Sequence, residues 1–143
     1  MLFKIPNILL TLLAVSASVG TASAAPNTFI NQKRSIIDPG EPMTCTFLFK
    51  PNTPETPLTW DEFDTIIDQA IQQATGGSNT FFLASKNTEN ADQTYTVNAQ
   101  FATEHHTAAE IIPIIDSLVG TTLKGLVRNW LVESASCVPS KVV

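Results

Sequence analysis

The sequence predicts one α+β domain, a ferredoxin-like split sandwich in which two helices cover one face of a four-stranded antiparallel sheet. Three observations support this fold class. Two segments alternate between apolar and polar residues, two others show helical periodicity behind capping boxes, and one cysteine lies near each end of the folded region. The elements follow the order strand, helix, strand, strand, helix, strand, which is the β-α-β-β-α-β arrangement.

The first strand is predicted over Met43–Lys50, where apolar and polar residues alternate. Its inward face holds Met43, Cys45, Phe47 and Phe49. Pro51, Pro54 and Pro57 then recur at every third residue, which favours a stiff extended connector over a Pro-x-x-Pro ligand for a partner domain.

The first helix is predicted to begin at Thr59, because Thr59-Trp60-Asp61-Glu62 has the spacing of a capping box. An apolar stripe follows, and Gly76-Gly77 supplies the stop. The stripe consists of Phe63, Ile66, Ile67, Ala70, Ile71 and Ala74. Asp61, Asp64 and Asp68 occupy the opposite face. They could form a carboxylate site, but favourable interaction with the helix dipole and a solvated face explain them better.

A hairpin is predicted next. Thr80–Ser85 reads as a short strand centred on Phe81-Phe82-Leu83, Lys86–Gln93 as a polar loop, and Thr94–Phe101 as a strictly alternating strand. The inward residues of the second strand are Tyr95, Val97, Ala99 and Phe101.

The second helix is predicted to begin at Thr107, where Thr107-Ala108-Ala109-Glu110 forms another capping box. Pro113 should kink this helix or move its start towards the proline. The last strand is expected within Val127–Cys137. If Cys137 faces inward, strict alternation also turns Glu133 inward, so either a bulge separates the two residues or the strand ends before Cys137. The expected core contains Phe47, Phe49, Phe63, Ile66, Ile67, Ile71, Tyr95, Val97, Phe101, Ile115 and Leu118.

The first 24 residues have the features of an export signal: a short charged start, the apolar stretch Ile5–Val19 and an A-x-A cleavage pattern ending at Ala24. The dibasic pair Lys33-Arg34 follows in a polar segment, which favours cleavage by a kexin-type protease over an ordinary surface pair. We therefore expect a signal peptide over residues 1–24, a propeptide over 25–34 and a single domain over 35–143.

Cys45 and Cys137 are expected to form one disulfide, because an even pair without C-x-x-C spacing in an exported chain is typical of a structural bond. They lie on the first and last strands, which are neighbours in the predicted sheet. Two buried free thiols are the alternative.

The charge distribution bears on possible partners. All thirteen acidic residues follow Ser35, and with five basic residues they give the predicted mature chain a formal charge of −8. Such a chain is poorly suited to bind nucleic acid or anionic membranes. No apolar run outside the signal is long enough to span a membrane.

The signal peptide, the Lys33-Arg34 site, and cysteines on the first and last strands together resemble small secreted fungal effectors, which are similar to the killer toxins of smut fungi. The resemblance covers the order of elements from Ser35 to Pro139, implies the ferredoxin-like fold, and supplies no catalytic residues.

An enzyme is not expected. His105 and His106, with Glu104 and Glu110, could form a metal or acid–base cluster, and Arg128 could neutralise phosphate in a ribonuclease-like site, but an exposed histidine pair explains them better.

We therefore expect a monomeric, non-enzymatic secreted effector or virulence-associated protein that binds a host protein, outside or inside host cells. It should need no cofactor or metal. The alternatives are a killer-toxin-like antimicrobial protein and a small secreted hydrolase such as a ribonuclease.

Overall fold

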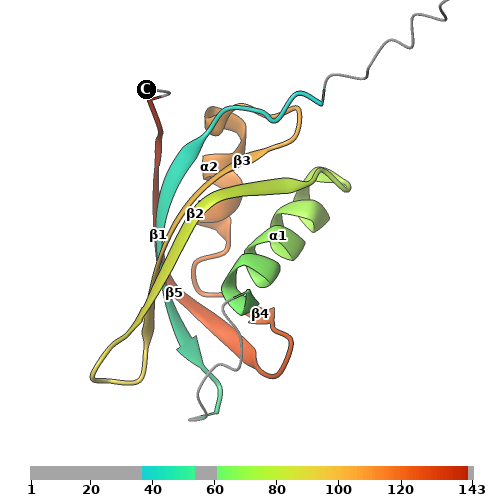
Figure 1. Cartoon of the computed structure of the whole chain (residues 1–143). Coiled ribbons are helices and arrows are strands. Elements are labelled where there is room, and N and C mark those ends of the chain that lie inside the picture. Colours follow the sequence, from blue (N-terminus) through green and yellow to red (C-terminus); the bar gives the residue numbers. More distant parts are fainter. Residues whose placement is uncertain (1–36, 54–60, 142–143) are drawn as a thin grey trace, which may run out of the picture. The chain divides into compact units, whose positions relative to one another are not determined.

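The computed structural model describes residues 37–53 and 61–141 (Figure 1). The predicted cleavage positions Ala24, Lys33 and Arg34 lie outside these residues, so the division into signal peptide, propeptide and mature domain stays a prediction. Within the described ranges, no helix is long and apolar enough to cross a membrane.

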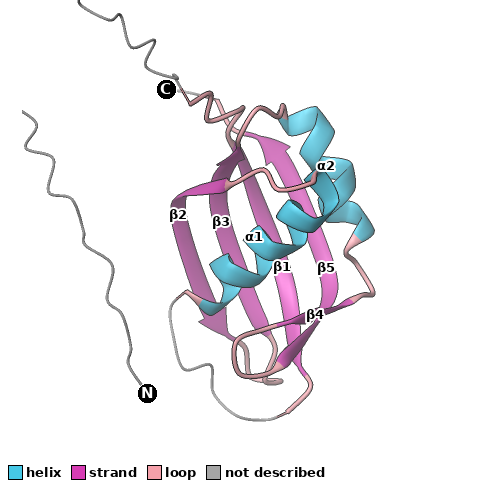
Figure 2. Ribbon diagram, turned by 90° about the vertical axis from the view of Figure 1, so that its right-hand side faces the viewer, coloured by secondary structure: helices cyan, strands magenta, loops and turns pink. Residues whose placement is uncertain are grey.

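In the described residues, five antiparallel strands form one curled sheet in the order β2-β3-β1-β5-β4, and two helices lie on the same face of it (Figures 1 and 2). The elements are β1 (Met43–Pro51), α1 (Glu62–Thr75), β2 (Thr80–Glu89), β3 (Tyr95–Thr103), α2 (Ala108–Ser117), β4 (Thr122–Lys124) and β5 (Asn129–Pro139).

The predicted α+β class is confirmed, but the four-stranded ferredoxin-like sandwich is wrong. Thr122–Lys124 pairs with the start of β5 and adds a fifth strand at the edge of the sheet. This strand has three residues, too few to show a recognisable alternation, so periodicity gives no signal for it. Gly125 helps to close the β4–β5 turn by donating its amide to the Arg128 carbonyl oxygen at 2.8 Å.

The first and last strands of the prediction are neighbours, as expected. The register of β1 with β5 places Cys45 directly opposite Cys137. The two residues form the predicted disulfide, and their Cα atoms are 4.1 Å apart. This covalent link therefore joins the central strand to its neighbour on one side.

A β-bulge explains how β5 accommodates Glu133. The β1–β5 pairing shifts between Leu48, which lies opposite Ser134, and Phe49, which lies opposite Val132, so Glu133 is the extra residue. Val132 is buried, whereas Glu133 is exposed, with its carboxylate 3.6 Å from the Lys50 ammonium. Of the two arrangements that the sequence permits, the bulge is the correct one.

Helix α1 begins later than predicted. Its N-cap is Asp61, and Thr59 lies outside the described residues. The Glu62 side chain is fully buried, and its Oε1 accepts a hydrogen bond from Trp130 Nε1 at 2.9 Å. The predicted start at Thr59 is therefore wrong by two residues, and the Glu62 side chain contacts the core. The end is as predicted: Gly76 adopts the left-handed conformation, with φ 76°.

Helix α2 follows the sequence prediction closely. Thr107 is the N-cap, and Glu110 Oε2 accepts a hydrogen bond from the Thr107 amide at 2.8 Å. The helix runs through Pro113, whose side chain lies on the exposed face. The proline thus does not move the helix start, although it removes one backbone donor.

Strand β2 extends to Glu89, so the first half of the loop predicted over Lys86–Gln93 is strand. The pairing of β2 with β3 shifts between Phe82 and Ala84, which makes Leu83 a bulged residue. The extra residue also changes which residues of β2 face the helices. Residues 86–89, beyond the bulge, are polar, so their composition indicates a loop although they form a strand.

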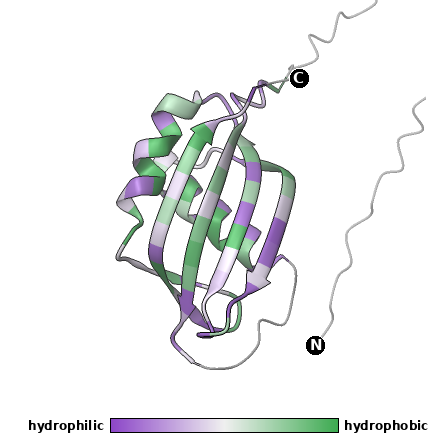
Figure 3. Ribbon diagram, turned by 90° about the vertical axis from the view of Figure 1, so that its left-hand side faces the viewer, coloured by the Kyte–Doolittle hydropathy of each residue, from purple (hydrophilic) through white to green (hydrophobic). Residues whose placement is uncertain are grey.

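The predicted core is confirmed, except that Leu118 is only partly buried against it. Several residues outside the expected core are also buried, among them Trp130, Val132 and Ile111. Figure 3 shows the helix-free face of the sheet, where polar and apolar residues alternate along the strands. The core therefore lies between the opposite face of the sheet and the two helices.

Candidate functional site

His106 lies where β3 meets α2, and its ring is close to two oxygen atoms from other segments. Nε2 is 3.2 Å from Ser78 Oγ, and Nδ1 is 3.8 Å from Glu110 Oε2. Serine, histidine and carboxylate thus meet in the order that can activate a serine nucleophile. Sequence reasoning predicted His106 and Glu110 as a possible pair but missed Ser78, because it lies 28 residues earlier.

The surrounding hydrogen bonds argue against a nucleophilic serine. Glu110 Oε2 accepts from the Thr107 amide and hydroxyl at 2.8 Å and 3.0 Å, and these bonds lower the pKa of Glu110. At 3.8 Å, the carboxylate is too far from the His106 ring for a hydrogen bond. The Ser78 amide donates to Thr75 Oγ1, so it is not available to stabilise an oxyanion. These contacts link the α1–β2 loop to the start of α2.

Glu104 and His105 form a separate pair. The Glu104 carboxylate lies 3.6 Å from His105 Nε2 and accepts a hydrogen bond from Asn79 Nδ2 at 2.9 Å. The two predicted histidines therefore contact different carboxylates. In residues 37–53 and 61–141, no group of three or more His, Cys, Asp and Glu side chains could hold a metal ion.

Arg128 lies at the opposite end of the sheet from the histidines. Met43, at one end of β1, pairs with β3 close to the histidine turn, whereas Pro51, at the other end, pairs with Trp130. Since β1 has nine residues, its ends are about 27 Å apart. The Arg128 guanidinium lies 5.6 Å from the Trp130 ring centroid. The structure does not bring together the residues of the ribonuclease-like site.

Glu62 and Trp130 form a buried polar contact that sequence reasoning missed. Trp130 also packs edge-on against Phe63 and Tyr95, with ring centroids 4.8 Å and 5.4 Å apart. Glu62 is fully buried within this aromatic cluster, and its carboxylate accepts the indole hydrogen bond. We assign the contact a structural role, because the hydrogen bond orients the largest core side chain. The spacing of residues within α1 carries no signal for a partner 68 positions away.

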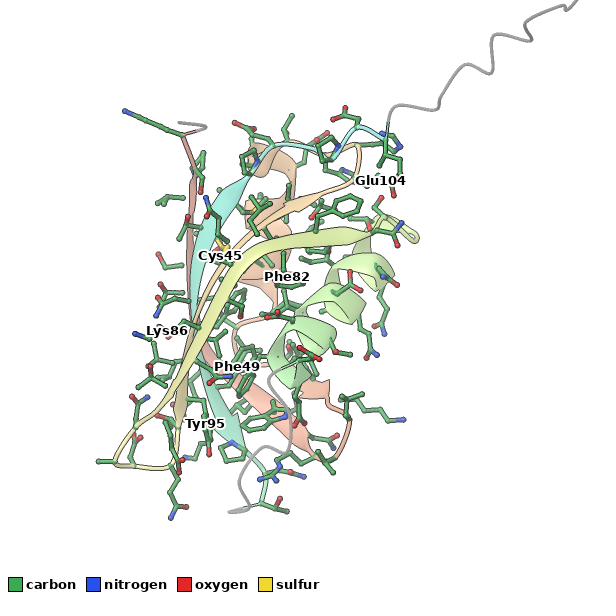
Figure 4. The ribbon with its side chains drawn as sticks, viewed as in Figure 1. Cys45, Phe49, Phe82, Lys86, Tyr95 and Glu104 are labelled. Carbon is green, nitrogen blue, oxygen red and sulfur yellow. A yellow bond between two sulfur atoms is a disulfide. The ribbon has the colours of Figure 1, made fainter. Side chains whose placement is uncertain are left out.

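A pocket of about 300 Å³ lies between the first turn of α1 and the bulge of β2. Two acidic residues line it from the helix side, and five β2 residues line it from the sheet. They are Asp61, Asp64, Phe82, Leu83, Ala84, Ser85 and Asn87. Figure 4 shows Phe82 directed towards α1 and Lys86 on the side of the sheet away from the helices.

Asp64 gives this pocket a distinct electrostatic character. Its Oδ1 atom is buried and has no hydrogen-bond partner among the described residues. Burial raises the pKa of Asp64, a hydrogen bond from the Ser85 hydroxyl lowers it in part, and the negative charge of Asp61 raises it further. The pocket thus presents a partly desolvated acidic wall. The predicted solvated face fits Asp61, which is exposed, but not Asp64, which is partly buried.

Asp68, the third acidic residue of the predicted helix, has a structural role. Its Oδ1 accepts a hydrogen bond from the Thr80 amide at 3.0 Å, and its Oδ2 accepts one from Gln72 Nε2 at 2.7 Å. These bonds tie α1 to the start of β2, so the three acids do not act as one carboxylate site.

Strand β2 is an edge strand of the sheet. In the described part of the chain it pairs only with β3, so the backbone groups on its other side have no strand partner. Leu83, at the bulge, is 61% exposed although it is apolar. The acidic pocket therefore lies next to an open strand edge.

Comparison of the chain with protein-family models, curated proteins and solved structures found no match.

Proposed function

We propose that the protein is a secreted, non-enzymatic effector that binds a host protein by strand addition at β2. The observation that carries this proposal is the open edge of a ten-residue strand. Unpaired backbone N–H and C=O groups on such an edge can pair with an extended segment of another chain. Backbone hydrogen bonds would supply affinity, and the pocket beside β2 would select the side chains.

The shape of β2 is compatible with strand addition. The bulge at Leu83 disturbs the ladder at one point, and the register then continues without a shift from Ala84 to Glu89. This regular part has about the length of a typical strand. A partner could therefore pair along it and also contact the exposed Leu83 side chain.

The disulfide supports the secretory part of the proposal. Bonds such as Cys45–Cys137 form and persist mainly in oxidising compartments. The bond also holds the central strand β1 to β5, which gives the edge strand a rigid sheet to extend. The same bond, on the first and last predicted strands, is one of the features shared with small secreted fungal effectors.

Leu83 and Leu126 provide a matched pair of variants for the test. Their side chains are 61% and 60% exposed, but one lies on β2 and the other in the β4–β5 turn. The wild-type protein, Leu83→Lys and Leu126→Lys should each be produced by secretion and used as bait in host-tissue extract. Cross-linking mass spectrometry then maps the contacts of the captured protein.

We expect the wild type and Leu126→Lys to capture the same host protein, with cross-links on β2. Leu83→Lys should reduce the capture about tenfold, because a charge at an apolar contact typically costs more than 1 kcal/mol. Equal capture by all three baits, or cross-links confined to other elements, would contradict strand addition. Catalytic turnover of the captured protein would contradict the non-enzymatic part of the proposal.

A further inference from the structure

The pocket beside β2 narrows the class of partner, and this inference rests on the strand addition proposed above. We infer that the added strand is an extended peptide with a lysine or arginine whose cationic group enters the pocket at Asp61 and Asp64. The face of β2 on which the pocket lies and the charge of the pocket lining lead to this inference.

The register of β2 shows which side of an added strand would meet the pocket. Ser85 lies opposite the buried Ala99 and therefore faces the helices, whereas Lys86 lies opposite the exposed Asn98 and faces the other side. Because side chains alternate along a strand, every second residue of an added strand would project on the helix side. A long side chain at one of these positions could reach the first turn of α1.

The lining of the pocket favours a cation at that position. It contains two carboxylates, those of Asp61 and Asp64, and no lysine or arginine. Asp64 Oδ1 is buried without a hydrogen-bond partner among the described residues. An ammonium or guanidinium group in the pocket would lie near both carboxylates and offset their negative charges. An apolar or acidic side chain would leave the two carboxylates without a counter-charge.

The net charge of the chain and the position of Lys86 also favour a basic partner. The predicted mature chain carries a formal charge of −8, so it attracts basic segments at long range. Lys86, the only cation of β2, points to the opposite face of the sheet (Figure 4). It therefore does not compete for the pocket.

A second copy of this chain does not meet these requirements. In an edge-to-edge pair of β2 strands with a continuous sheet, the copy would place Ser85 and Asn87 on the helix side and Lys86 on the other. No cation of the second β2 would enter the pocket. Two strongly acidic chains would also repel each other. A basic peptide from a different protein fits the site better.

The test uses three synthetic seven-residue peptides of alternating threonine and valine, with lysine, norleucine or glutamate at the central position. Each is titrated into the secreted protein labelled with nitrogen-15, and the backbone amide shifts are followed by NMR. Asp64→Asn and Asp61→Asn are compared with Asp116→Asn, which removes the same charge from an exposed position on α2.

We expect all productive binding to shift amides of β2, and the lysine peptide to bind about fivefold more tightly than the norleucine peptide. Glutamate should bind least. Asp64→Asn should remove most of the lysine preference, Asp61→Asn part of it, and Asp116→Asn little. Bound lysine peptide should also lower the pKa of Asp64, read from its carboxyl carbon shift.

The possible failures are distinguishable. Equal binding of the three peptides at β2 would overturn the basic-residue inference and leave strand addition standing. An absence of β2 shifts with all three peptides at millimolar concentration would overturn both. β2 shifts that depend on protein concentration without peptide would assign the edge to a second copy. An unchanged lysine preference in both Asp61→Asn and Asp64→Asn would place the cation elsewhere.

Discussion

Removal of the disulfide should destabilise the protein by an amount that the structure allows us to work out. Cys45 and Cys137 are 92 positions apart, so their bond closes most of the described chain into one loop. In the chain-entropy model, a loop of this length corresponds to about 4.6 kcal/mol at 25 °C. We expect Cys45→Ser, Cys137→Ser to lose about 2–5 kcal/mol, because measured values often fall below the model.

The folded state of the double variant should persist, since the backbone ladder between β1 and β5 does not depend on the bond. Cys45 is fully buried, however, and a serine hydroxyl there must be desolvated. Cys45→Ala, Cys137→Ala separates this cost from the loss of the cross-link. A difference between the two double variants measures the hydroxyl term alone.

Equilibrium urea unfolding, followed by tryptophan fluorescence and far-UV circular dichroism, measures the loss. The m-value should rise in both double variants, because an unfolded chain without the cross-link exposes more surface. Each single variant should lose about as much as the double, although its remaining thiol can form dimers. Thiol counting on the denatured, unreduced wild-type protein provides the chemical control.

Two results would refute this reasoning. A loss below about 1 kcal/mol in the alanine double variant, with an unchanged m-value, would show that the loop constraint contributes little. Two free thiols per chain in the unreduced secreted protein would show that the bond does not form.

Four further predictions concern the core, the β4–β5 turn, one carboxylate and processing. Ile67→Ala should cost about 2–5 kcal/mol in urea unfolding, because Ile67 is fully buried, and a cost below about 0.5 kcal/mol would contradict its place in the core. Gly125→Ala should cost about 1–3 kcal/mol by the same measurement, since a Cβ there would clash with the Arg128 carbonyl oxygen; an unchanged midpoint would contradict this close approach. The pKa of Asp64 is raised above 3.8, so its contribution to stability is present below that pH and is lost as the pH rises through the folded-state pKa. Asp64→Asn should therefore reduce the fall in melting temperature on going from pH about 3 to about 7, and an identical or steeper fall would argue against the desolvated carboxylate. N-terminal sequencing and intact mass of the secreted protein should give Ser35 as the first residue, and a chain that begins only at Ala25 would exclude cleavage at the dibasic pair.

Local sequence was sufficient wherever a pattern repeats within one element. Strict alternation predicts β3, the capping box at Thr107 predicts the start of α2, and Gly76 marks the end of α1. These features depend on backbone geometry and on interactions between residues only a few positions apart. The cysteine pair was also predictable, because the two cysteines of a chain that is predicted to be exported allow one intramolecular bond.

Tertiary structure decided the features that depend on distant partners. The bulges at Leu83 and Glu133 are features of cross-strand register, and the buried Glu62 carboxylate accepts a hydrogen bond from Trp130, 68 positions away. The acidic pocket exists only because the first turn of α1 lies against the bulge of β2. The local sequence of a strand does not show where a bulge will insert an extra residue. The local sequence of a helix does not show which distant side chain will contact that helix. Packing between separate segments settles both, so the candidate binding site could not be predicted from the chain alone.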